Sequence, residues 1–191
     1  MPHTVHTILF TGHRLDDDNR PVPRFPRQME PPAHAAIRGS VRALLRKHGA
    51  AIGIAGGASG GDILFHEVCG ELGVPSRVYL PLPIDRFVAQ SVAPAGEEWV
   101  RRFEAIAARV PVIVEPGPAE ARAQDEGRAW ERHNLTLLTH ALEHGPDHVT
   151  VLALWNREPG DGRGGTEHLV EQARAEGVDV RILDTRTLFD L

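Results

Sequence analysis

A glycine-rich stretch at residues 55–62 constrains the fold of this chain more than any other segment. It has the sequence Ala-Gly-Gly-Ala-Ser-Gly-Gly-Asp and follows an apolar run, residues 50–54, that is typical of a buried strand. Residues 63–72 then have the pattern of a helix, which Ser59 or Asp62 could cap. Glycines allow close approach of a ligand, and a helix N-terminus attracts anions. The stretch alone predicts either a phosphate-binding loop or a tight turn without a ligand.

The strand-then-helix order recurs along the chain. This alternation predicts an α/β fold with a mostly parallel sheet, in which all of residues 1–191 form a single domain. The predicted strands are 5–11, 50–54, 76–80, 111–114, 149–155 and 178–183, and the predicted helices are 32–47, 63–72, 85–91, 96–109, 128–143 and 167–176.

Composition narrows the function classes. A formal net charge of -5 argues against nonspecific nucleic-acid binding, and an aromatic content of 5% argues against a stacking groove for single-stranded DNA. The single cysteine, Cys69, excludes an internal disulfide and fits a cytoplasmic protein; its helical neighbours predict a buried apolar position. The N-terminus does not resemble a signal peptide, and no apolar run is long enough to span a membrane.

Every unusual loop in the sequence follows a predicted strand. These loops are residues 12–14, 56–62, 81–83 and 156–166. Because ligands of parallel α/β sheets bind beyond the carboxyl ends of the strands, we expect the loops to meet at one edge. Two glycine-rich loops there suit a ligand with a phosphate and a second polar group, such as a nucleotide. Neither loop has a dinucleotide fingerprint or a Walker sequence.

Two further sets of polar residues are candidates with open alternatives. Glu131 and Asn134 lie one turn apart on helix 128–143 and either face the site, or serve the helix dipole and a nearby loop. Residues 15–32 form a long proline-rich loop. Its arginines, Arg20, Arg24 and Arg27, either clamp a phosphate or pair with the aspartates at 16–18.

Three motifs resemble those of the SLOG superfamily, which includes the DNA-processing protein DprA, the Lonely Guy phosphoribohydrolases and many nucleotide-sensor domains. Residues 11–14, Thr-Gly-His-Arg, resemble its GxR motif, and residues 56–62 resemble its GGAxGxD loop. His66 stands where DprA proteins have a histidine, and residues 164–166 resemble the GGxGT loop of Lonely Guy enzymes. The resemblance implies a Rossmann-like, three-layer α/β/α fold that binds a nucleotide-derived ligand.

One departure from that family weakens an enzymatic interpretation. Lonely Guy enzymes have a glutamate three residues after the threonine of the GGxGT loop, and this chain has Leu169 there. Glu167 and Glu171 flank it, but on a helix they should point elsewhere. Cleavage of an N-glycosidic bond needs carboxylates near the reacting centre. Glu131 or Asp62 is the candidate catalytic carboxylate if the chain is an enzyme.

The sequence therefore favours a module that senses a nucleotide or nucleotide-derived small molecule, without a cofactor or metal. A nucleoside 5′-monophosphate phosphoribohydrolase is the alternative, and binding of single-stranded DNA is a weaker third; a homo-oligomer stays open. The spacing of His140 and His144 lacks a third metal ligand, which favours a solvated helix face. The predicted ligand-binding residues are Thr11, Gly12, His13, Arg14, Gly56, Gly57, Ala58, Ser59, Gly60, Gly61, Asp62, Glu131, Asn134, Asp161, Gly162, Gly164, Gly165 and Thr166.

Overall fold

The computed structural model describes residues 5–115, 126–160 and 164–190, and their strands form one six-stranded sheet. The strand order is β4-β3-β2-β1-β5-β6, and every pairing is parallel. The sheet is thus wholly parallel where a mostly parallel one was predicted. The strands are β1 (His6–Gly12), β2 (Ala51–Ala55), β3 (Ser76–Leu80), β4 (Val112–Val114), β5 (Val149–Trp155) and β6 (Asp179–Asp184).

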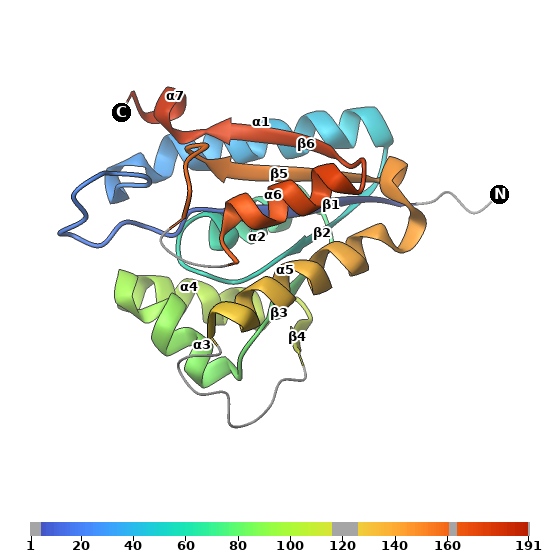
Figure 1. Cartoon of the computed structure of the whole chain (residues 1–191). Helices are drawn as coiled ribbons and strands as arrows, with labels where there is room; N and C mark the ends of the chain where they lie inside the picture. The colour runs from blue at the N-terminus through green and yellow to red at the C-terminus, as the bar shows by residue number, and fades with distance from the viewer. Residues whose placement is uncertain (1–4, 116–125, 161–163, 191) are drawn as a thin grey trace.

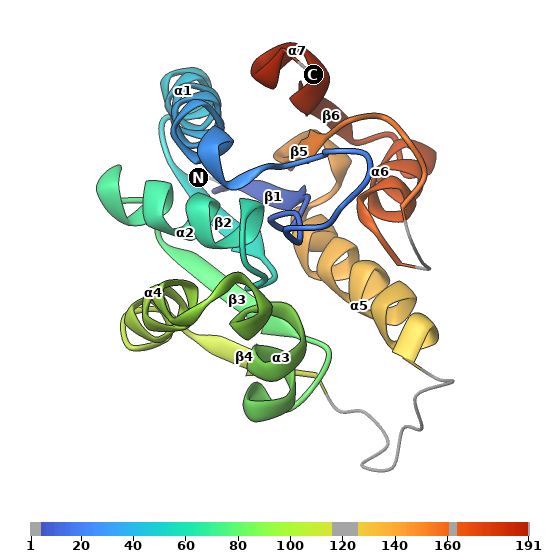
Figure 2. The same ribbon diagram turned by 90° about the vertical axis from the view of Figure 1, so that its left-hand side faces the viewer.

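Helices cover both faces of the sheet, which confirms the three-layer α/β/α architecture (Figure 1). Helices α1, α2 and α4 pack on one face, and α5 and α6 pack on the other (Figure 2). The helices are α1 (Glu30–His48), α2 (Gly61–Glu71), α3 (Ile84–Ser91), α4 (Glu97–Ala107), α5 (Glu126–Ala141), α6 (Thr166–Ala175) and α7 (Thr185–Phe189).

The central strand β1 contributes to a hydrophobic core on each face of the sheet. Ile8 and Phe10 belong to the cluster beneath α1, α2 and α4. Leu9 points the other way and joins Leu137 and Leu169 beneath α5 and α6. All three β1 side chains are at most 1% exposed. Burial on both faces explains why this strand is a continuous apolar run rather than an alternating one.

The order in which strands are added to the sheet reverses at β1, although all strands run in the same direction. Strands β2 to β4 extend the sheet on one side of β1, whereas β5 and β6 extend it on the other. In the register, Leu9 pairs with Ile54 of β2 and with Val151 of β5. Figure 2 looks on to the edge at which the strands end. The gap between the β1 and β5 loops at this edge is a topological switch point, where open α/β sheets bind ligands.

The structure refines several element boundaries. Helix α1 begins at Glu30, two residues earlier than predicted, because Pro31 and Pro32 occupy first-turn positions that need no N–H donor. Helix α7 was not predicted; Asp184 caps it by accepting a hydrogen bond from the Arg186 backbone. Among the residues described above, no helix has the length and apolarity needed to cross a membrane.

Candidate functional site

A pocket of about 690 Å³ lies at the edge where the strands end. It is bounded by the ends of β1 and β5, the β2–α2 loop, α3, α5 and the start of α6. The two glycine-rich loops therefore meet at one site, as the sequence predicted. The lining residues are Phe10, Thr11, Gly12, His13, Arg14, Arg24, Gly56, Ala58, Asp62, Phe87, Ala89, Gln90, Ser91, Pro94, Trp130, His133, Asn134, Leu137, Trp155, Gly160, Gly164, Gly165, Thr166 and Glu167.

Two glycines of the first loop serve internal packing. A Cβ atom on Gly57 would lie 2.8 Å from the ring of Phe103, and one on Gly61 would lie 3.1 Å from the ring of Phe10. Neither glycine lines the pocket formed by the described residues. Their lack of a side chain lets the loop and helix α2 sit close to the core.

Two other residues of this loop also lie behind the pocket wall. Gly60 has φ +94°, and a Cβ there would lie 2.7 Å from the backbone nitrogen of Leu15. The backbone N–H of Ser59 donates to the carbonyl of Ser91 at the end of α3, with an N–O distance of 2.9 Å. Neither Ser59 nor Gly60 lines the pocket of the described chain. These contacts fix the loop against its neighbours.

Asp62 is the polar side chain that this loop presents to the pocket. No side chain caps α2, so the predicted capping by Ser59 or Asp62 is wrong. Asp62 Oδ2 instead accepts a hydrogen bond from the backbone N–H of Ala58, 3.2 Å away. Burial raises the pKa of the Asp62 carboxyl to about 7, although the Ala58 N–H and the charge of Arg14 act in the opposite direction. Near neutral pH this group can both hold and release a proton.

His66 supports the first loop from beneath. Its Nε2 lies 2.9 Å from the carbonyl oxygen of Gly56, and its Nδ1 lies 3.0 Å from Oγ of Ser76. Burial lowers the pKa of His66 to about 4, so the ring is neutral at pH 7. His66 is 3% exposed and does not line the pocket of the described residues. Its role is therefore to position the Gly56 peptide.

The loop after β1 connects both halves of the site. The backbone N–H of His13 donates to the Leu154 carbonyl of β5, and its carbonyl accepts from the Gly61 N–H of α2. Its Nε2 lies 3.0 Å from Oδ1 of Asn156. Arg14 also lines the pocket, and its guanidinium donates to the Gln90 carbonyl at the C-terminal end of α3 (3.2 Å).

The second glycine-rich loop is held by Asn134. Its Nδ2 donates to the carbonyls of Gly164 and Gly165, at 2.8 and 3.1 Å. The structure thus gives Asn134 both of the roles left open, because it bonds the nearby loop and also lines the pocket. Helix α6 begins at Thr166 without a side-chain cap, and the Thr166 hydroxyl lies 3.5 Å from that of Thr11.

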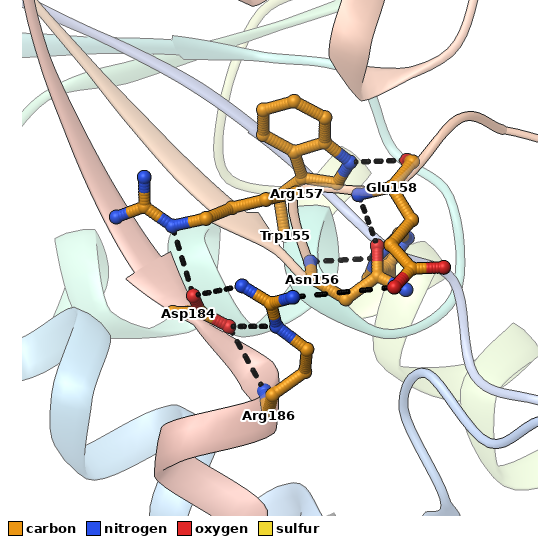
Figure 3. Close-up of polar contacts among 7 residues, drawn as sticks. Trp155, Asn156, Arg157, Glu158, Asp184 and Arg186 are labelled. Carbon is orange, nitrogen blue, oxygen red and sulfur yellow. Dashed lines mark hydrogen bonds and ion pairs between the residues drawn. The ribbon is translucent and has the colours of Figure 1, made fainter.

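The predicted site residues Asp161 and Gly162 lie outside the described residues. The turn before them is anchored to the end of β6, as Figure 3 shows. Trp155 Nε1 donates to the Glu158 carbonyl, and Arg157, which has φ +63°, pairs with Asp184 at 2.8 Å. Hydrogen bonds from Arg186 lower the pKa of Asp184 to about 2. Asp184 therefore stays ionised and holds this turn at physiological pH.

Helix α5 presents Asn134 to the pocket as predicted, but its other pocket residues differ from the prediction. Glu131 does not line the pocket of the described residues, whereas its neighbours Trp130 and His133 do. His133 Nδ1 lies 2.5 Å from Oε1 of Glu115, which directly follows β4. The sequence analysis missed both members of this pair. The signal available was the position of Glu115 at the carboxyl end of a strand, where site residues gather.

The start of α6 departs from the sequence expectation at Glu167. Leu169 is fully buried in the core beneath α6, so it offers no polar group to the site. Glu167 lines the pocket, and the expectation that it points elsewhere is wrong. One carboxylate on α6 therefore does face the site. It lies two residues before Leu169, the position at which the Lonely Guy motif has its glutamate.

The three arginines of the 15–32 loop have different surroundings. Arg20 pairs with Asp16 at 3.5 Å, as one alternative predicted. Arg27 donates to the Ala95 carbonyl at 2.6 Å. Arg24 lines the pocket, which makes it the member of the set that is placed to meet a ligand.

Cys69 and His140, which the sequence analysis considered as a reactive and a metal-binding residue, both take part in packing. Cys69 is fully buried, and burial raises the pKa of its thiol to about 12, so it is an apolar core residue. The ring of His140 packs on that of Tyr79, with centroids 4.9 Å apart. Over the described parts of the chain, the side chains that ligate metals nowhere form a group of three suited to an ion.

Comparisons with known proteins bear on the fold. No protein-family model matches the sequence, and no curated protein matches it. The structure matches DprA from Streptococcus pneumoniae with a TM-score of 0.58 and 18% identity, over 95% of this chain and 53% of that one. The chain thus spans about half the length of that DprA.

Two further solved structures are less similar. TM1055 matches with a TM-score of 0.49 and 15% identity, over 92% of this chain and 72% of that one. DprA from Helicobacter pylori, described for its single-stranded DNA binding mode, matches with a TM-score of 0.44 and 14% identity, over 98% and 80%. The match to the Streptococcus protein shows that the chain has a Rossmann-like α/β fold of the kind found in DprA.

Proposed function

We propose that the pocket binds a nucleotide or a nucleotide-derived small molecule. The observation that carries this proposal is the combination, in one pocket, of the guanidinium groups of Arg14 and Arg24 with the partly exposed ring of Trp130. Guanidinium groups suit phosphate oxygens, and aromatic rings offer a stacking surface to a base. The pocket volume of about 690 Å³ lies within the range of small-molecule sites.

The start of α6 supports the same proposal. Its first-turn N–H groups have no side-chain cap, and the hydroxyl groups of Thr11 and Thr166 lie beside them. Such a helix N-terminus favours a phosphate through its N–H groups and its dipole. Gly164 and Gly165 precede it with their carbonyls bound by Asn134, so these two residues are held in place before a ligand arrives.

A binding experiment tests this function. The purified protein is titrated calorimetrically with nucleoside mono-, di- and triphosphates and cyclic nucleotides, and small molecules released by denaturing it are identified by mass spectrometry. We expect saturable binding of at least one member, weakened about tenfold or more by Arg14→Gln, which removes one charge-assisted contact. The control is the same substitution at the exposed Arg109, just after α4. Arg109→Gln should leave the affinity unchanged. Absence of saturable binding to every member would refute the proposal.

A phosphoribohydrolase is the second candidate, and the Asp62 carboxyl favours it. A group whose pKa is raised to about 7 can donate a proton to a leaving base, and Glu167 supplies a carboxylate in the same pocket. We expect such an enzyme to release free base from a nucleoside monophosphate, and to lose at least about a hundredfold in rate in Asp62→Asn. Glu131→Gln serves as the comparison, because Glu131 lies outside the pocket lining. No release of base after long incubation would eliminate this candidate.

A further inference from the structure

The pocket contains a pair of polar side chains, Asp62 and His133, of which the sequence motifs predict only Asp62. A Cβ atom placed on Gly56 would lie 2.7 Å from Oδ2 of Asp62 and 3.7 Å from Nε2 of His133. The space in front of Gly56 is therefore bordered by a carboxyl group from α2 and an imidazole nitrogen from α5. Both side chains line the pocket.

Glu115 determines which nitrogen of His133 faces this space. The Nδ1 atom lies 2.5 Å from Oε1 of Glu115, so Nδ1 carries a proton and donates it to the carboxylate. In the neutral ring Nε2 then has the lone pair and is an acceptor. Among the described residues, none forms a hydrogen bond with Nε2, and the side chain is 4% exposed. An acceptor that lies at the pocket surface can take a hydrogen bond from a donor on the ligand.

We infer that His133 and Asp62 form the subsite for the uncharged base of the ligand, with His133 accepting from an N–H group and Asp62 donating to a neighbouring acceptor. This inference rests on the proposed function. Nucleobases present such a donor beside an acceptor on one edge. Trp130 lines the same pocket and meets His133 edge-on, with ring centroids 6.1 Å apart at 84°. Its ring offers the base an aromatic surface.

The subsite has a built-in dependence on pH. Because burial raises the pKa of Asp62 to about 7, its carboxyl carries a proton below that pH and can donate. Above it, Asp62 becomes an acceptor beside a second acceptor, His133 Nε2, and the match with the base is lost. The other charged or titratable groups at the pocket are His13, Arg14, Arg24 and Glu167 lining it, and Glu115 behind His133.

The test compares adenosine and guanosine 5′-monophosphates with ribose 5-phosphate between pH 5.5 and 8.5. The ratio of the affinity for a nucleotide to the affinity for ribose 5-phosphate isolates the contribution of the base, because titration of the phosphate affects both kinds of probe. For the wild-type chain we expect at least one nucleotide to bind about tenfold or more tightly than the sugar phosphate at pH 6, and this ratio to approach one at pH 8.5. In Asp62→Asn, whose amide keeps a donor and an acceptor, the ratio should no longer fall as the pH rises through 7.

Substitutions of histidine complete the test. His133→Phe keeps an aromatic ring and removes the acceptor, so the affinity ratio should fall to about one at every pH; His133→Gln retains an acceptor and should preserve part of it. His140→Phe, on the same helix and outside the pocket, should behave like wild type. A ratio in wild type that does not change with pH, or one that survives His133→Phe, overturns the subsite while nucleotide binding stands. Failure of all three probes and of the wider nucleotide panel to bind overturns both proposals.

Discussion

The imidazole Nε2 of His66 lies 2.9 Å from the carbonyl oxygen of Gly56. Gly56 is also the residue whose would-be Cβ borders both Asp62 and His133. His66 is neutral, since burial lowers its pKa to about 4, so Nε2–H donates to Gly56 while Nδ1 accepts from the Ser76 hydroxyl. The ring thus connects α2, the end of β2 and the start of β3. The wall of the pocket is positioned by a side chain that does not itself face the pocket.

Replacing His66 should therefore destabilise the fold. His66→Leu keeps most of the volume but leaves the Gly56 carbonyl and the Ser76 hydroxyl buried without partners. We expect a loss of about 2–3 kcal/mol in the free energy of unfolding, measured by urea denaturation at pH 7.5. The same substitution at the exposed His140 should cost less than about 0.5 kcal/mol. Equal effects at both positions would contradict the positioning role of His66.

Replacing two glycines at α2 by alanine should change the stability in opposite directions: Gly60 precedes the helix, and Gly70 lies within it. Gly60 has φ +94°, and a Cβ there would meet the backbone nitrogen of Leu15 at 2.7 Å, so Gly60→Ala should cost at least about 2 kcal/mol. Gly70 lies within α2 with no atom within 4 Å of its would-be Cβ. Gly70→Ala should stabilise by about 0.5–1 kcal/mol. Thermal unfolding of the two variants gives the signs directly.

Stability should fall on the acid side of neutrality because of buried histidines. Burial lowers the pKa of His6 to about 4, and its ring stacks on His48 with centroids 3.6 Å apart. The unfolded chain takes up the proton near pH 6.5, so the stabilising contribution is complete above that pH and is lost as the pH falls towards 4. His6 and His66 each add at most about 1.4 kcal/mol per pH unit to this slope.

The variant His6→Gln measures the contribution of His6 to that slope. Glutamine does not titrate and can still bond the Thr150 hydroxyl, which lies 3.0 Å from His6 Nε2. Urea unfolding at half-unit steps from pH 4.5 to 7.5 should give a shallower decline in the variant than in the wild type. Parallel curves would show that His6 does not resist protonation in the folded state.

Asp62 should make the fold less stable as the pH rises. Its folded pKa, about 7, lies above the unfolded value near 3.8, so the difference favours folding below pH 3.8 and is lost as the pH rises through 7. Asp62→Asn removes the titration and should become increasingly more stable than wild type from pH 5 to pH 8. The gain should be on the order of 1–3 kcal/mol, because solvent in the pocket reduces the effect. A gain of equal size at pH 5 and pH 8 would contradict the raised pKa.

Much of the fold follows from local sequence. The strands of the sheet are short apolar runs, and β3 and β5 have the predicted bounds because turn-forming residues flank them. Helix α7 was missed because it has only five residues and a weak pattern, and its stability comes from the Asp184 cap and from packing against α1. The order of the strands follows from no single segment, since it depends on which distant strands pair.

The candidate site was less predictable than the fold. Glycines at 57, 60 and 61 appear as ligand contacts in a motif, yet the atoms that exclude a Cβ come from Phe103, Leu15 and Phe10, far away in sequence. The ring of His133 is held by Glu115, which follows β4 and is distant in sequence. Residues of this kind are identified by tertiary contacts, for which the local pattern carries no signal.

The reversal of strand order beside β1 also has a consequence for how the chain matures. Thr7 pairs with Ile52, which follows it early in the sequence, and with Val149, which is synthesised much later. The β1 half of the pocket therefore waits for β5 and α6 before it is complete. A ligand that needs both halves binds only after β5 and α6 have joined β1, so it stabilises that state by mass action and leaves chains that lack β5 and α6 unaffected.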